Sequence, residues 1–188
     1  MRVFALLLAA VLGAALPSAA HAEEIEVRDV ALRGTEEGLA LDADFALELT
    51  PRLAEVLANG VPLYFRVDFE LTRRRWYWFD DTAASHSLQL RLSYHALSRH
   101  YRLSTGSLQQ SFPTLEEALN VLTRVRNWLV VDRTARLADA DYEAGVRMRL
   151  DITLLPKPFQ LSALTGRDLQ LESPWKRFIV RAPLRKPR

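Results

Sequence analysis

Apolar residues at every second position are the feature that most constrains how this chain can fold. The alternation runs through residues 39–49, 63–71, 88–94 and 142–154. Successive side chains of a β-strand point to opposite faces, so a period of two is typical of strands with one buried and one wet face. Such strands usually belong to antiparallel sheets.

Helical patterns are few and do not alternate with the strands in β-α-β order. We therefore predict an α+β, mainly antiparallel β fold, a sandwich-like domain of about seven strands with two helices. Further strands are predicted at residues 25–32, around Leu169 and Leu171, and at an edge formed by residues 174–182. Pro156 and Pro158 are expected to end the strand of residues 142–154, because proline cannot donate to a ladder.

The clearest strand pairing is a hairpin around a loop of residues 96–99. With that loop length, Leu92 faces Leu103, Tyr94 faces Tyr101 and His95 faces His100. Cross-strand pairs of this kind fix the register of a hairpin.

Two helices are indicated by their capping residues. Thr50 and Pro51 begin a short helix that Asn59-Gly60 ends. Thr114 begins the second helix, where Glu117 completes a capping box. Apolar residues at helical spacing predict that this second helix continues through Leu129; they are Leu115, Leu119, Leu122, Val125 and Leu129.

The first residues have the layout of a secretory signal peptide. Arg2 gives a positive start, residues 3–16 are apolar, and Ala20-His21-Ala22 offers an A-x-A cleavage site. The apolar run is shorter than the roughly 20 residues of a membrane-spanning helix. We predict a signal peptide at 1–22, a periplasmic or otherwise exported chain without a further transmembrane segment, one β-rich domain at 23–180 and a basic disordered tail at 181–188.

Charge and motifs narrow the classes of function. Without Arg2 the chain carries 24 basic and 23 acidic side chains, a balance that predicts no nucleic-acid partner. It has no cysteine, no G-x-S-x-G motif and no glycine-rich phosphate loop. The acids at positions 80, 81, 139 and 141 are interpreted as turn residues. We predict a protein that is not an enzyme and holds no cofactor.

His95 and His100 are the weak candidates for a metal site. A facing pair of imidazoles supplies two ligands for zinc or copper, and the remaining ligands would have to come from elsewhere. Arg91, Arg99 and Arg102 surround the pair with positive charge, which opposes a cation. We therefore expect no metal here.

The stretch LTRRRWYWFDD, residues 71–81, contains the candidate partner-binding residues. An unbroken strand would place charged side chains on the core face, so a bulge or a turn is expected at residues 73–75. Trp76 and Trp78 would then take the core face. Arginine and aromatic residues are enriched in protein interfaces. The predicted partner-binding residues are Arg73, Arg74, Arg75, Tyr77 and Phe79.

In order, the chain contains LANGVPLYFRVDFELTRRRWYWFDD, LRLSYHALSRHYRLS, SFPTLEEALNVLTRVRNW, YEAGVRMRLDITLLPKPFQLS and SPW. This succession resembles the uncharacterised proteobacterial family DUF4390 over nearly the whole predicted mature chain. The resemblance implies an exported protein without assigned catalytic residues. It also implies a regulatory partner, because genes of the family tend to lie near that of a membrane sensor histidine kinase of the nitrogen-regulation type.

The leading hypothesis is a non-catalytic envelope protein that binds another envelope or membrane protein, with a sensor kinase as one such partner. One alternative is a carrier of a small apolar or lipid ligand between its sheets, which a cavity lined by inward leucines would favour. The other alternative is a hydrolase whose site is assembled only in space.

Overall fold

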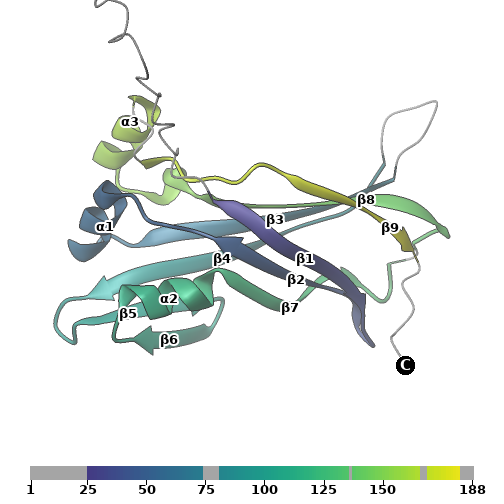
Figure 1. The fold of residues 1–188 in the computed structure, drawn as a ribbon, viewed down its shortest axis with the longest axis horizontal. Coiled ribbons are helices and arrows are strands. Elements are labelled where there is room, and N and C mark those ends of the chain that lie inside the picture. Colours follow the sequence, from purple (N-terminus) through teal and green to yellow (C-terminus); the bar gives the residue numbers. More distant parts are fainter. Residues whose placement is uncertain (1–24, 74–80, 136, 166–168, 183–188) are drawn as a thin grey trace, which may run out of the picture.

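The computed structural model describes residues 25–73, 81–135, 137–165 and 169–182, which form two antiparallel sheets around one core (Figure 1). The strands are β1 (Glu26–Gly34), β2 (Gly38–Ala46), β3 (Leu63–Arg73), β4 (Asp81–His95), β5 (His100–Thr105), β6 (Leu108–Phe112), β7 (Arg124–Asp132), β8 (Ala140–Leu150) and β9 (Lys176–Ala182). The helices are α1 (Pro51–Ala58), α2 (Leu115–Leu122), α3 (Lys157–Thr165) and a 3₁₀ turn, η1 (Ile152–Leu154).

The smaller sheet has the strand order β1-β2-β7, and the larger has the order β6-β5-β4-β3-β8-β9. This architecture confirms the predicted α+β, mainly antiparallel fold. The described residues form nine strands and three α-helices, more than the sequence indicated. Two of the additional elements, β6 and α3, have no strong apolar pattern of their own.

The core lies between the two sheets and is centred on β3. Every second residue of that strand, from Leu63 to Leu71, is completely buried. The inward side chains of β2 and β8 complete the core, as their alternation predicted. Because one face of β3 is fully buried, its other face must carry the polar half of the pattern, and that face forms the outside of the larger sheet.

The predicted hairpin is confirmed residue by residue. Leu92 pairs with Leu103, Tyr94 with Tyr101, and His95 with His100. The two tyrosine rings lie 4.9 Å apart at a tilt of 44°, which suits the geometry preferred by aromatic pairs. Beyond Thr105 the chain turns at Gly106 and adds β6 to the same sheet.

Both predicted helix starts are confirmed, but the second helix is shorter than predicted. Thr50 and Thr114 accept hydrogen bonds from Leu53 N and Glu117 N at 3.0 and 3.2 Å. Helix α2 ends at Leu122, and Thr123 is buried where its hydroxyl donates to Leu119 O at 2.8 Å. The extension through Leu129 is therefore wrong.

Strand β7 occupies the segment that was predicted to continue the helix. The sequence RVRNWLVV is rich in β-branched and aromatic residues, which lose side-chain freedom in a helix and pack well on a sheet. Pairing with β2 supplies the main-chain hydrogen bonds that a longer helix would have made. The apolar spacing of this segment suits a helix and a strand equally, and pairing with β2 therefore decided in favour of the strand.

The pairing of β7 with β2 is irregular. The register shifts between Leu39 and Ala40 and again between Leu41 and Ala43. Asn127 has a φ of 50°, a left-handed conformation that asparagine tolerates better than most residues. Its N–H donates to Asp42 Oδ1 at 2.7 Å. A side chain therefore satisfies a group that the ladder leaves free.

The C-terminal part also differs from the sequence interpretation. Strand β8 ends at Leu150, and Asp151 caps η1 by accepting from Thr153 N at 3.2 Å, so residues 152–154 do not extend the strand. The two prolines lead into α3, because proline is tolerated in the first turn of a helix. Leu169 and Leu171 are buried, and the described residues around them form no regular strand; Glu172 makes an isolated bridge with Arg149.

Strand β9 confirms the predicted edge strand at residues 174–182. It pairs with β8 and runs through Ala182, which is buried, so the globular part extends two residues into the segment interpreted as a tail. Among the described residues, none of the helices is long and apolar enough to cross a membrane.

Candidate binding surface on the large sheet

The outer face of the larger sheet carries a cluster of charged side chains from β3 and β8. Because Phe65, Val67 and Phe69 point inward, Arg66 and Asp68 point outward. The antiparallel register places Arg149 opposite Arg66 and Arg147 opposite Asp68. Asp68 and the two β8 arginines, which lie 79 and 81 residues apart in sequence, thus come together beside Arg66.

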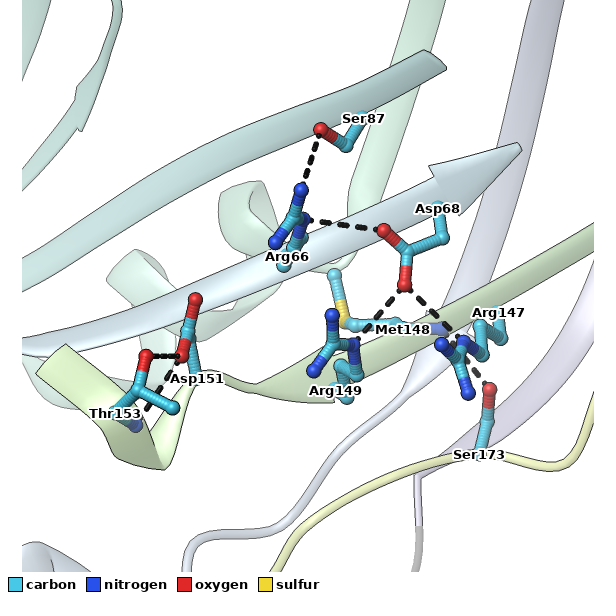
Figure 2. Close-up of polar contacts among 9 residues, drawn as sticks. All are labelled: Arg66, Asp68, Ser87, Arg147, Met148, Arg149, Asp151, Thr153 and Ser173. Carbon is cyan, nitrogen blue, oxygen red and sulfur yellow. Dashed lines mark hydrogen bonds and ion pairs between the residues drawn. The ribbon is translucent and has the colours of Figure 1, made fainter. Parts of the chain in front are cut away.

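The Asp68 carboxylate holds these three guanidinium groups in place (Figure 2). Its Oδ2 accepts hydrogen bonds from Arg149 Nε at 3.0 Å and from Arg147 Nε at 3.1 Å. Its Oδ1 lies 3.2 Å from Arg66 Nε. Arg66 Nη2 in turn donates to Ser87 Oγ of β4 at 3.2 Å. We call the three arginines and Asp68 the Asp68 cluster.

The Asp68 cluster has an excess of positive charge at a partly open position. The Asp68 side chain is 14% exposed, whereas those of Arg147 and Arg149 are each 29% exposed. Both of these arginines use Nε for Asp68, and the forked Nη ends are the part of a guanidinium that recognises carboxylates and phosphates in a bidentate manner. A fixed cluster of this kind is suited to receiving an anion from outside.

Trp175 covers the neighbouring part of the same face. Gly145 of β8 makes room for it, because a Cβ at that position would lie 3.1 Å from Trp175 Cε3. The Arg147 guanidinium carbon is 4.6 Å from the centre of the Trp175 ring, and that of Arg177 is 5.7 Å from it. Cation–π contacts of this length orient a guanidinium while leaving its edge free for hydrogen bonds.

Other arginines lie along the same face of the sheet. The guanidinium carbon of Arg91 lies 5.8 Å from the centre of the Tyr64 ring. Arg177 Nη1 forms an ion pair with Glu143 Oε1 at 2.7 Å. Arg102 of β5 has a buried Nε without a hydrogen-bond partner among the described residues. We name this surface, with the Asp68 cluster and Trp175 at its centre, the arginine face.

Of the predicted partner-binding residues, Arg73 is the one within the described part of the chain. It is half-buried at the end of β3, where its backbone is the register partner of Asp81 on β4. The register between β3 and β4 shifts between Leu71 and Thr72, whereas the break expected at residues 73–75 falls largely outside the described residues. Arg74, Arg75, Tyr77 and Phe79 lie outside the described residues, as do Trp76 and Trp78.

The sequence interpretation did not single out the Asp68 cluster. The alternation of residues 63–71 implies that Arg66 and Asp68 lie on the polar side of a strand, but nothing local indicates that β8 is the neighbour of β3. The available signal was the pattern of Arg147 and Arg149 at alternate positions of an otherwise apolar strand.

The two facing histidines each use a ring nitrogen within their own turn. His95 Nδ1 accepts from Ser98 N at 3.2 Å, and His100 Nδ1 lies 2.5 Å from Ser98 O. Within the described ranges, no three histidine, aspartate or glutamate side chains are grouped so as to hold a metal ion.

One motif for nucleophilic catalysis is present in the sequence and was missed. Ser173 and Lys176 have the spacing S-x-x-K. Ser173 is buried, and its Oγ accepts a hydrogen bond from Met148 N at 3.0 Å, while Lys176 is exposed at the start of β9. This serine therefore joins the segment before β9 to β8.

Comparison with known proteins places the chain in a family and gives no named relative. No curated protein and no solved structure matches the chain. Residues 22–179 match the family model described as "Domain of unknown function (DUF4390)". The matched residues include all of β1 to β8 and most of β9. The chain, with its two-sheet fold and its arginine face, therefore belongs to the DUF4390 family.

Proposed function

We propose that this chain is an exported, non-catalytic envelope protein whose arginine face binds an acidic segment of another envelope or membrane protein. The observation that carries the proposal is the arrangement of three guanidinium groups around the single carboxylate of Asp68. The family resemblance suggests a membrane sensor kinase as the partner. Export rests on the signal-peptide pattern of residues 1–22.

The geometry favours an acidic protein segment over an isolated small anion. The positive groups are spread along the sheet from Arg91 to Arg177 and are interleaved with the rings of Tyr64 and Trp175. Arginine with aromatic residues is the composition enriched in protein interfaces. An extended segment with several carboxylates can contact several of these guanidinium groups at once.

Preorganisation is the physical advantage of this surface. A flexible arginine loses side-chain entropy when it binds, whereas Arg147 is already held between Asp68 and the Trp175 ring. Arg147 would therefore lose less side-chain entropy when it makes a bidentate contact with a partner carboxylate. Electrostatic attraction of this kind also raises the association rate and weakens as salt is added.

The defined test is binding of a glutamate-rich peptide, measured by calorimetry at low and at physiological salt. The wild type should bind, and the double variant Arg147→Ser/Arg149→Ser should bind at least tenfold more weakly while keeping its far-ultraviolet circular dichroism. The matched control is Arg33→Ser/Arg52→Ser, which removes two arginines, both ion-paired and about half exposed, elsewhere on the molecule. Equal weakening by both double variants would show that the protein responds only to total charge.

The biological partner is tested by crosslinking in the native envelope. The wild type and the Arg33→Ser/Arg52→Ser control should yield the same crosslinked protein, and Arg147→Ser/Arg149→Ser should lose it. Intact-mass measurement of the exported protein tests the other half of the proposal, because the mature chain should begin at Glu23. A chain that retains Met1 would contradict cleavage.

A further inference from the structure

The two sheets differ in width, and this leaves a groove at one side of the core. The larger sheet continues through β5 and β6, while the smaller sheet ends at β7 (Figure 1). In the larger sheet, the inner face of strands β4, β5 and β6 is therefore only partly covered. β7 covers it along one side, and α2 covers it at one end. A groove of about 310 Å³ remains between them. We call it the inter-sheet groove.

Apolar side chains from all these elements line the inter-sheet groove. Its walls include Leu88, Leu90, Leu103, Leu108, Val121 and Trp128. Leu108 is 71% exposed and Val121 is 39% exposed, although both belong to the inward or groove-facing side of their elements. Large apolar side chains that border a hollow and stay in contact with water are typical of a binding site.

The charged residues at the inter-sheet groove are all of one sign. Arg124 and Arg126 contribute to its lining, and no aspartate or glutamate is among the described residues that form it. Arg126 is held by Asp44 at 2.5 Å and by Val125 O at 2.8 Å. Arg124 is exposed, and its guanidinium has no hydrogen-bond or ion-pair partner among the described residues, although its backbone pairs with Asp44 in the sheet. A free cation thus borders an apolar hollow.

We propose that the inter-sheet groove binds a single-chain anionic amphiphile, a fatty-acid-like carboxylate whose chain lies along the leucines and whose head group pairs with Arg124. The volume lies at the lower end of the range for small-molecule pockets, about 300–1,000 Å³, which suits one chain rather than a two-chain lipid. The inference is independent of the arginine face, which lies on the opposite side of the same sheet.

The larger hollow elsewhere in the molecule does not share this chemistry. It has a volume of about 560 Å³ between α1, α2 and the end of β2. Its lining includes Glu48 and Glu116 as well as Arg28, so it offers neither a continuous apolar wall nor an excess of positive charge. The inter-sheet groove is the smaller site with the more consistent lining.

The first experiment is a chain-length series on the mature protein by calorimetry, with hexanoate, octanoate and decanoate kept below their micelle concentrations. Each buried methylene should tighten binding by about fourfold, until the groove is filled. Decanoate should bind more tightly than decanol, because only the carboxylate pairs with Arg124. Affinities that do not depend on chain length would overturn the proposal.

Variants separate the groove from nonspecific adsorption. Leu108→Asp places a like charge against the carboxylate and should weaken decanoate binding by at least tenfold. Leu97→Asp, at an even more exposed leucine in the β4–β5 turn, should not. Arg124→Ser should remove the preference for decanoate over decanol and leave decanol binding unchanged. Equal effects of the two leucine variants would refute the groove as the site.

A last arm distinguishes a free amphiphile from a membrane surface. Vesicles of phosphatidylcholine with phosphatidylglycerol should compete poorly with monomeric decanoate for the protein. Binding to such vesicles without binding to monomeric decanoate would overturn the proposal in favour of a membrane contact.

Discussion

The substitution Asp68→Asn tests whether one carboxylate organises the arginine face. It keeps the shape of the side chain but removes the charge that three guanidinium groups share at 3.0–3.2 Å. The cluster is partly open, so each pair is valued near the upper end of the range for exposed ion pairs, about 0.5–1 kcal/mol. Three such pairs predict a loss of about 1.5–3 kcal/mol in the free energy of unfolding.

For a domain of this length, that loss corresponds to a fall in melting temperature of roughly 3–12 °C. Differential scanning calorimetry measures the change, with Glu55→Gln as the control, because Glu55 pairs with a single exposed arginine. The control should change the free energy of unfolding by no more than about 0.5 kcal/mol. Added salt should reduce the deficit of Asp68→Asn, since screening weakens the repulsion among the three arginines.

The same substitution should have the opposite effect on binding. Asp68 competes with an external carboxylate for the guanidinium groups, and Trp175 still orients Arg147 when the carboxylate is gone. The gain in net positive charge should therefore outweigh the lost preorganisation and tighten binding of the glutamate-rich peptide, even as the fold becomes less stable. Arg147→Ser/Arg149→Ser should weaken that binding. If Asp68→Asn leaves stability within about 0.5 kcal/mol of the wild type, the carboxylate does not organise this face and the reasoning fails.

Two further predictions concern the packing that supports these surfaces. Leu122→Ala should cost about 2–5 kcal/mol of unfolding free energy in urea titration, because Leu122 is 1% exposed, whereas the adjacent Val121→Ala should cost well under half as much. Gly145→Val should force the Trp175 ring off the sheet, since even a Cβ would lie 3.1 Å from it; a red shift of tryptophan fluorescence and weaker peptide binding are expected. An unchanged spectrum with unchanged binding would show that the ring position is irrelevant to the arginine face.

The sequence predicted local pairings well where one short loop determined them. Tyr94 and Tyr101 are separated by a six-residue interval, so the hairpin register followed from the apolar pattern alone. The segment after Leu122 was misassigned because Val125 and Leu129 suit a helical face and a strand equally. Only the presence of β2 as a neighbour decided between them.

The arginine face could not be predicted from the sequence for a related reason. The outward direction of Arg66 and Asp68 followed from the alternation of β3, but the identity of the neighbouring strand did not. Asp68 meets Arg147 and Arg149 only because β8 returns to β3 from far along the chain. Likewise, the inter-sheet groove depends on where the smaller sheet ends, a property of the whole topology rather than of any segment.

The irregular pairing at Asn127 bears on whether the edge of the smaller sheet can pair with another chain. β7 is one of the two edge strands of the smaller sheet and borders the inter-sheet groove, a position where a second chain could add a strand. The left-handed residue and the shifted register bend this border away from the flat shape that such addition requires. This irregularity therefore makes the edge of β7 beside the inter-sheet groove a poor template for strand addition by a second copy.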